Sequence, residues 1–276
     1  MILRFLLVVS YIAYCARLRT NPSRYFQLNA THFNPHKGYF SKLDIDQLIP
    51  SKWRLRQCLD NGVDTDFSYP VFVKPEWGQN GHGIQRADDA AMLTSIRTHA
   101  IDRKMPHIIQ EAAPGAREFE IFWVLSAQDE RRPAVFGVAE ATNPCAERYP
   151  INSVKHPNTA YHDITASLDD AQLDALWQHM RSLGRLVIAR AGVRADTIEQ
   201  LINGDFHVIE VNLFVPMPLH VLDADTPWEQ RVREVCRTTR ALAHMTRRIP
   251  RNQATRSIFF RKWRLSRRNK MLPLTR

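Results

Sequence analysis

Hydrophobic residues recur at the three- and four-residue spacing of an α-helix in several parts of the chain. The clearest case is 169–189, where leucine, tryptophan, methionine and valine side chains repeat at i+3 and i+4 after an acidic start. Related patterns predict helices over residues 2–16, 52–59, 87–98 and 229–245. Asn61-Gly62 would end the short helix over 52–59, because this dipeptide is a strong turn former.

Short runs rich in β-branched and aromatic residues predict strands between these helices. The runs cover residues 71–73, 107–110, 119–125, 133–139, 192–201 and 206–212. Asn203-Gly204 separates the last two runs and is typical of a tight hairpin turn. We therefore expect 192–201 and 206–212 to pair as neighbouring antiparallel strands.

The apolar N-terminal run, residues 2–16, has three interpretations: a helix docked on the protein, a helix lying on a membrane surface, or a cleaved signal peptide. Arg17 and Arg19 follow at once, and no clear small-residue cleavage site is present. As a helix the run would extend about 22 Å, which is shorter than the roughly 30 Å hydrocarbon core of a bilayer. These features favour the docked helix.

Composition excludes several classes of protein. The chain has 276 residues, of which 44% are hydrophobic and 24% charged, so we expect one large or two modest globular domains and not a disordered, collagenous or coiled-coil chain. The four cysteines, Cys15, Cys58, Cys145 and Cys236, form no Cys-x-x-Cys pair. A disulfide scaffold or a cysteine-based zinc site is therefore not expected, and a reducing compartment fits better.

The first motif that suggests chemistry joins a strand to a glycine-rich loop. Lys74 follows the predicted strand over 71–73 directly, and the loop after it contains Gly78, Gly81 and Gly83. Such a loop can turn backbone N–H groups toward anionic oxygens, and the lysine adds a positive charge. The Gly-Lys-Ser/Thr ending of a Walker A loop is missing. An ordinary glycine-rich hairpin remains the alternative.

The second motif follows the strand over 107–110. That strand ends in Gln110-Glu111, a Pro-Gly turn follows, and Glu118 begins the next predicted strand. Backbone groups at a strand end and a nearby carboxylate would suit a nucleoside, with the carboxylate accepting from ribose hydroxyls. Taken alone, the pattern favours a solvated hairpin.

The third motif is the most specific. Arg194 and Asp196 lie two residues apart, as do Glu210 and Asn212 in the next predicted strand, so each pair shares one face of its strand. Carboxylate and amide oxygens in one place form a hard site that suits magnesium with water and phosphate. Arg194 beside them could stabilise a developing oxyanion.

These elements, in this order, resemble the ATP-grasp superfamily, and most closely its D-alanine–D-alanine ligase-like branch, over roughly residues 50–225. The resemblance implies that Lys74 contacts nucleotide phosphate and that the loop with Gly78, Gly81 and Gly83 closes over the phosphates. The adenine would lie at Gln110 and Glu111 and the ribose at Glu118. Asp196, Glu210 and Asn212 would bind magnesium, or manganese in its place, and Arg194 would steady the tetrahedral intermediate.

Two further correspondences and one departure accompany the resemblance. Arg56 stands where a second phosphate-binding lysine is usual, and Lys155 resembles the lysine of the loop that folds over the site. Each is equally compatible with a surface cation. The segment Leu213–Pro218 lacks the hydroxyl and glycine of the substrate-handling segment in D-alanine ligases, which argues against D-alanine as the substrate.

The resemblance implies an α+β ATP-grasp fold, in which two α+β subdomains hold ATP between them. We expect an N-terminal segment over 1–50, the ATP-grasp domain over 51–245 and a basic helical tail over 246–276. The implied activity is an ATP- and magnesium-dependent ligase that joins a small carboxylate to an amine through an acylphosphate. A phosphotransferase of the same fold and a non-catalytic nucleotide-binding module are the alternatives.

The positive charge is concentrated near the C-terminus. The net charge of the whole chain is +10, yet residues 226–276 carry 15 Lys and Arg against two acids, so the remainder has a net charge of −3. Besides plain solvation, cations with interleaved aromatic residues suit an anionic membrane surface or single-stranded nucleic acid. The apolar N-terminus favours the membrane, so no specific nucleic acid is expected. ATP dependence implies a cytoplasmic protein, peripheral to the inner membrane face if the tail binds lipid.

Overall fold

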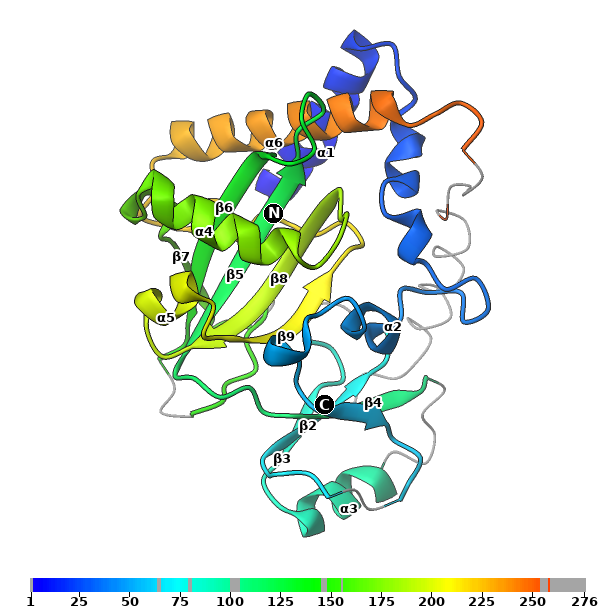
Figure 1. Cartoon of the computed structure of the whole chain (residues 1–276), viewed down its shortest axis with the longest axis vertical. Helices are drawn as coiled ribbons and strands as arrows, with labels where there is room; N and C mark the ends of the chain where they lie inside the picture. Colours follow the sequence, from blue (N-terminus) through cyan, green and yellow to red (C-terminus); the bar gives the residue numbers. More distant parts are fainter. Residues whose placement is uncertain are drawn as a thin grey trace.

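Two antiparallel sheets form the framework of the protein (Figure 1). The computed structural model describes residues 2–63, 66–78, 81–99, 105–144, 148–154, 156–253 and 258. The smaller sheet has the strand order β1-β4-β2-β3, and the larger has the order β7-β6-β5-β8-β9. The α+β class, with the two subdomains that an ATP-grasp fold implies, is confirmed by this arrangement.

The smaller subdomain is built from a four-stranded sheet and one helix. Its strands are β1 (Gln57–Leu59), β2 (Val71–Pro75), β3 (Gln85–Ala87) and β4 (His107–Glu111), with helix α3 (Ala90–Thr98) beside them. Asp89 begins the helix, because its carboxylate accepts a hydrogen bond from the backbone N–H of Met92 at 2.7 Å. Leu93 and Ile96 of the helix pack on Val71 and Val73 of the central strand.

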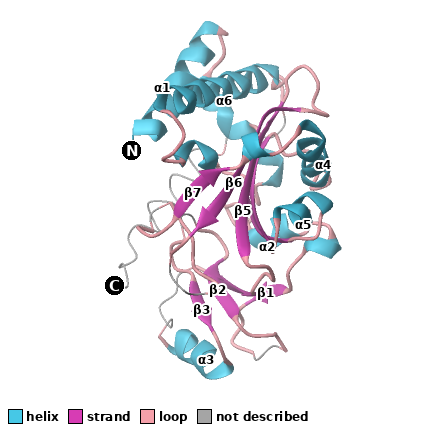
Figure 2. Ribbon diagram, turned by 90° about the vertical axis from the view of Figure 1, so that its left-hand side faces the viewer, coloured by secondary structure: helices cyan, strands magenta, loops and turns pink. Residues whose placement is uncertain are grey.

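The larger subdomain has a five-stranded sheet covered on one face by helices. Its strands are β5 (Arg117–Leu125), β6 (Pro133–Thr142), β7 (Ala160–Asp163), β8 (Ile188–Ala195) and β9 (His207–Asn212). Helices α4 (Asp170–Arg181) and α5 (Ile198–Asn203) lie on one face of this sheet (Figure 2). Trp123 of β5 meets Trp177 of α4 there, with ring centroids 6.3 Å apart. Because side chains alternate along a strand, the neighbours of Trp123 in β5 point to the other face.

The first and last described helices pack on each other beside that other face. They are α1 (Ile2–Arg17) and α6 (Trp228–Arg248). Two hydroxyl pairs join them: Ser10 to Thr239 at 2.8 Å and Tyr11 to Thr246 at 2.9 Å. The N-terminal run is thus the docked helix that the sequence favoured. Among the described residues, no helix combines the length and apolar character needed to cross a membrane.

The chain between α1 and β1 belongs to the larger subdomain. It contains α2 (Lys42–Asp46) and the 3₁₀ turns Pro22–Gln27, Ala30–His32 and Ser51–Trp53; two further 3₁₀ turns cover Thr165–Ser167 and Leu219–Leu222. Asn29 donates to the carbonyl of Ile188 at 2.6 Å, and Trp53 stacks on Phe206 at 4.7 Å between centroids. The predicted boundary at residue 50 therefore falls inside one hydrophobic core.

Three sequence predictions are wrong in detail. Residues 52–59 form a 3₁₀ turn and strand β1 instead of a helix, and the helix predicted over 169–189 ends at Arg181. The hairpin predicted across Asn203-Gly204 is instead the short helix α5 between two strands. Thr197 begins this helix, since its hydroxyl accepts from the N–H of Gln200 at 3.1 Å, and Gly204 ends it with φ of +84°.

The remaining helices and strands are confirmed within a few residues of their predicted bounds. Of the predicted tail over 246–276, residues 254–257 and 259–276 lie outside the described residues. Membrane contact by this tail stays a prediction.

Candidate functional site

A row of polar side chains crosses the larger sheet on the face opposite α4 and α5. In the strand register, Gly192 lies between Glu120 and Glu210, and Arg190 lies next to Asn212. Because these positions are two residues apart on each strand, their side chains project from the same face. Three neighbouring strands, β5, β8 and β9, therefore present one acidic and basic cluster.

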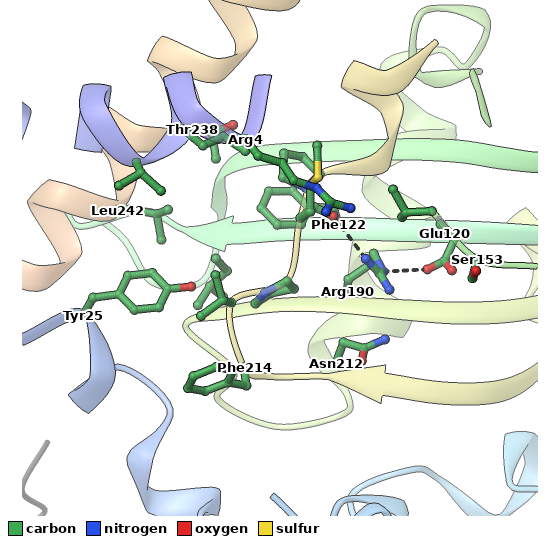
Figure 3. Close-up of a pocket in the computed structure, with 18 of the residues that line it drawn as sticks. Arg4, Tyr25, Glu120, Phe122, Ser153, Arg190, Asn212, Phe214, Thr238 and Leu242 are labelled. Carbon is green, nitrogen blue, oxygen red and sulfur yellow. Dashed lines mark hydrogen bonds and ion pairs between the residues drawn. The ribbon is translucent and has the colours of Figure 1, made fainter. Parts of the chain in front are cut away.

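This cluster forms one end of a cavity of about 650 Å³. In Figure 3 a dashed line joins Arg190 to Glu120, and Asn212 lies on the next strand. The Arg190 Nε lies 2.9 Å from Glu120 Oε2, and a terminal nitrogen of Arg190 lies 3.4 Å from the carbonyl of Met217. The Asn212 side chain donates to Glu210 Oε1 at 2.7 Å, which fixes the direction of both groups.

Two lysines approach the same cluster from outside the larger sheet. Lys42 of α2 lines the cavity and donates to the carbonyl of Pro75 at 3.0 Å. Lys74 of β2 donates to Gln110 Oε1 at 2.6 Å and lies 3.3 Å from the carbonyl of Ile209 in β9. The buried ammonium of Lys74 thus links the smaller sheet to the larger one, next to Glu210.

The pKa directions follow from burial and from these charges. Burial lowers the pKa of Lys74 to about 7, and Lys42 acts in the same direction, while Glu210 opposes both. Burial alone would raise the pKa of Glu210, but Lys42 and Lys74 outweigh it and lower the pKa.

Burial raises the pKa of Glu120 despite its partner Arg190. Burial and the neighbouring Glu120 raise the pKa of Glu118 to about 8. Opposed carboxylates and cations held out of water are common at functional sites.

The glycine-rich loop borders this end of the cavity. Gly78 and Gly81 line it, and Gly81 and Gly83 have φ of +69° and +74°, a region that favours glycine. Residues 79 and 80 of the loop lie outside the described residues. The structure therefore places Gly78, Gly81, Glu210 and Asn212 around one end of the cavity, with Lys74 beside Glu210.

Arg194 and Asp196 do not belong to the cluster. The Arg194 guanidinium donates to the carbonyls of Gly115 and Arg148 at 3.0 and 2.9 Å, and its Cζ lies 4.9 Å from the Tyr149 ring centre. Asp196 is exposed, and its carboxylate accepts from the N–H of Ala116 at 2.9 Å. Both side chains hold loops together, so we correct the predicted grouping of Asp196 with Glu210 and Asn212.

Helix α5 is the physical reason for this correction. A two-residue turn at 203–204 would have placed Asp196 beside the residues around Val211. Because residues 198–203 are helical, the pairing shifts, and Gly192 instead of Asp196 faces Glu210. Asp196 then lies four residues beyond Gly192, or about 13 Å along an extended chain.

The other predicted residues lie at varied distances from the cluster. Gln110 contacts Lys74 and also donates to the carbonyl of Ile209 at 3.2 Å. Glu111 accepts from the N–H of Ser68 at 2.8 Å, and Arg56 packs beside it over the Phe67 ring, at a centroid distance of 4.9 Å. Neither lines the cavity. Lys155 lies outside the described residues.

Glu118 lies next to the cluster without lining the cavity. It precedes Glu120 by two residues on β5 and so shares its face, and it accepts from the Asn152 side chain at 3.1 Å. Asn152 itself lines the cavity, so the Asn152 side chain lies between Glu118 and the open space.

Sequence reasoning missed three residues at this end of the cavity: Lys42, Glu120 and Arg190. Glu120 and Arg190 each stand two or four residues from a predicted residue on the same strand, so alternation along β5 and β8 could have identified them. Lys42 comes from a helix far from the motifs in sequence, and only the tertiary fold places it near Glu210.

The donor set fits a divalent cation with phosphate. Glu120, Glu210 and Asn212 direct oxygens to one end of the cavity, and hard oxygen ligands are those that magnesium prefers. Lys42, Lys74 and Arg190 surround them and match the negative charge of phosphate oxygens. The oxygens and cations at this end are therefore of the types that a metal–phosphate group needs.

Comparison with known proteins supports the motif-based resemblance. No family model matches the chain. The D-alanine–D-alanine ligase of Streptomyces coelicolor is 30% identical over 182 residues, which are 64% of this chain and 43% of the relative. The chain thus spans less than half the length of this curated relative. The predicted resemblance to ATP-grasp carboxylate–amine ligases is confirmed.

Three solved structures show partial similarity. The L-amino acid ligase of Bacillus licheniformis has a TM-score of 0.41 at 17% identity, covering 63% of this chain and 40% of its own. The VanG D-Ala:D-Ser ligase of Enterococcus faecalis gives 0.49 at 12% identity, covering 75% and 61%. The D-alanine–D-alanine ligase of Bacillus anthracis complexed with ATP gives 0.43 at 14%, covering 83% and 67%. Because all three scores lie below 0.5, the fold assignment rests on the two sheets and the motif order.

Proposed function

We propose that the protein is an ATP- and magnesium-dependent ligase that joins a carboxylate to an amine through an acylphosphate. The observation that carries the proposal is the convergence of Lys42, Lys74, Arg190 and the oxygens of Glu210 and Asn212 beside a glycine-rich loop. Phosphoryl transfer needs little covalent help from a protein and depends on positioned opposite charges, which this cluster supplies.

The chain's residues take the following roles in the proposal. Glu210 and Asn212, with Glu120 in place of Asp196, hold magnesium, which when bound neutralises phosphate charge. Lys42 and Lys74 contact phosphate oxygens. Arg190, in place of Arg194, orients the carboxylate of the acid and stabilises the oxyanion that forms when the amine attacks.

Nucleotide binding requires a rearrangement at Lys74. In the described structure its ammonium donates to Gln110, and the adjoining cavity, which Lys42, Lys74 and Glu210 line, measures only about 20 Å³. That volume accommodates roughly one water. ATP must therefore break the Lys74–Gln110 hydrogen bond and separate β2 from β9 before a phosphate reaches Lys74.

A thermal-shift experiment tests the nucleotide part of the proposal. ATP with magnesium at a hundredfold excess over Kd should add about 2.7 kcal/mol of stability by mass action, while ATP with a chelator should add much less. The variant Glu210→Gln should lose most of the magnesium-dependent shift, and Glu199→Gln, an exposed glutamate of α5, serves as its control. No shift with millimolar ATP and magnesium would contradict the proposal.

Trapping with hydroxylamine distinguishes the ligase from a phosphotransferase. An acylphosphate reacts with hydroxylamine to give a hydroxamate and inorganic phosphate, whereas a phosphorylated alcohol does not. The proposal predicts ATP-dependent hydroxamate from a carboxylic acid substrate. A stable phosphorylated product without hydroxamate would favour the phosphotransferase. Because the proposed reaction consumes ATP, the proposed location of the protein is the cytoplasm.

A further inference from the structure

The cavity extends beyond the charged cluster into an apolar half. Its walls there come from α1, α6, the turn over Pro22–Gln27 and the segment after β9. Representative lining side chains are Val8, Tyr25, Phe122, Phe214 and Leu242. In Figure 3, Tyr25, Phe214 and Leu242 lie at the end of the cavity away from Glu120 and Asn212. One continuous space thus joins a charged end to an apolar end.

An exposed cation and a buried hydroxyl, neither with a partner among the described residues, also line the cavity. Arg4 of α1 lines the cavity and reaches toward Phe122 and Arg190 in Figure 3. Within the described part of the chain, its guanidinium forms no hydrogen bond or ion pair. Thr238 of α6 also lines the cavity; it is only 1% exposed, and its hydroxyl has no hydrogen-bond partner among the described residues. A buried hydroxyl without a partner is costly unless a ligand satisfies it.

The segment between β9 and the following turn is shaped for this space. Phe214, Val215 and Pro216 line the cavity, and Val215 has φ of +47°, which is rare for a β-branched residue. Strained backbone of this kind persists where the surrounding structure fixes it, and it is common at ligand sites. The strain therefore lies in the wall that joins the apolar half to Asn212.

We propose that the apolar half binds the side group of the carboxylic acid substrate, and that this acid is one with a bulky apolar chain or ring. The proposal rests on the ligase function above. The carboxylate lies toward Arg190 and Arg4, and the apolar group contacts Val8, Phe214 and Leu242. A cavity of about 650 Å³ is in the usual range for small-molecule sites, and a methyl side group would leave its apolar walls in water. Helix α1 is then a wall of the substrate site.

Binding of chosen acids to the full chain tests the proposal without requiring turnover. The probes are phenylalanine in both enantiomers, octanoate, alanine and glutamate, measured by calorimetry with ADP and magnesium present and absent. Phenylalanine or octanoate should bind at least about tenfold more tightly than alanine, because more apolar surface leaves water. Preference between these two probes distinguishes an amino acid from a simple carboxylic acid. Octan-1-ol, which lacks the carboxylate, should bind more weakly than octanoate.

Two neighbouring valines of α1 provide a matched pair of variants. Val8 and Val9 are both exposed, but only Val8 lines the cavity. Val8→Asp places a like charge in the site and should weaken binding of the preferred acid about tenfold or more. Val9→Asp introduces the same change on the same helix and should leave binding within about twofold. Equal effects of the two variants, or alanine or glutamate binding as tightly as the apolar acids, would overturn the proposal.

Hydroxamate formation with the same acids separates this inference from the proposed function. Hydroxamate from alanine or glutamate, but not from apolar acids, supports the ligase and refutes the apolar substrate. Tight binding of an apolar acid that Val8→Asp weakens, without hydroxamate from any acid, supports the binding site and refutes the ligase.

Discussion

The buried ion pair between Arg190 and Glu120 should be essential to the stability of the larger sheet. The side chains of Arg190 and Glu120 are 15% and 9% exposed, and the two groups are 2.9 Å apart. At an effective dielectric constant of about 20, unit charges at this distance attract by about 6 kcal/mol, and desolvation offsets much of that. Arg190→Met removes the attraction and leaves the carboxylate buried, so it should cost about 3–5 kcal/mol of unfolding free energy.

A second pair on the surface supplies the control. Arg185 and Glu130 lie 2.7 Å apart, but their side chains are 62% and 33% exposed. Arg185→Met should therefore cost no more than about 1 kcal/mol, because water screens an exposed pair. The two methionine variants make the same chemical change at nearly the same distance. The pairs differ in burial, and the Arg185 guanidinium also donates two hydrogen bonds to Glu130.

The companion variant is Arg190→Met combined with Glu120→Gln. Since it leaves neither charge unpaired, it should be more stable than Arg190→Met alone by about 1–3 kcal/mol. Glu210 keeps Lys42 and Lys74 as its positive neighbours in every variant. Unfolding in denaturant, followed by tryptophan fluorescence, gives each free energy. If adding Glu120→Gln destabilises Arg190→Met further, the two residues are not coupled as described.

The pH dependence of Arg190→Met gives an independent check. Burial already raises the pKa of Glu120, and loss of Arg190 should raise it further above the value in the unfolded chain. A folded state that binds the extra proton loses stability as pH rises through the folded pKa. The cost of Arg190→Met should therefore be larger at pH 8 than at pH 5. If the unfolding free energy lost in Arg190→Met does not depend on pH, Glu120 is not a buried, unpaired carboxylate in this variant.

Variants at three other places test separate parts of the structure. Glu210→Gln should abolish ATP turnover while circular dichroism stays that of the wild type, and wild-type turnover would refute the metal assignment. Because the pKa of Lys74 is about 7, ATP should recharge this lysine, and calorimetry in buffers of different ionisation enthalpy should detect proton uptake at pH 8 that Lys74→Met lacks. Gly137→Ala should cost about 1–3 kcal/mol, because a Cβ there would lie 2.3 Å from the buried His220 ring, and His220→Ala should relieve much of that cost.

Local sequence patterns predicted most of the elements but not the register between them. Lys74 and Gln110 meet because β2 pairs with β4, and their strands were visible as β-branched runs. Glu210 and Asn212 share a face by simple alternation. The Arg194-x-Asp196 motif misled because Asn203-Gly204 suits both a hairpin turn and a helix end. The Thr197 hydroxyl accepts from the N–H of Gln200 and so favours the helix. Because this helix shifts the pairing of β8 with β9, Gly192 faces Glu210.

Long-range placement accounts for what the sequence did not predict. Lys42 is 168 positions before Glu210, and both residues line the same cavity. Helices α1 and α6, at opposite ends of the described chain, also line it. No spacing rule connects such segments, because tertiary packing alone brings them together. The hydroxyl pair of Ser10 and Thr239 shows how specific that packing is.

Transfer of labelled oxygen tests the proposed acylphosphate most directly. The acid that supports turnover is prepared with ¹⁸O in its carboxylate and incubated with ATP, magnesium and the amine. If the acid is phosphorylated and the amine then displaces phosphate, the inorganic phosphate released carries one ¹⁸O from the acid, as mass spectrometry would show. Phosphate without label, or label recovered in AMP, would contradict the account.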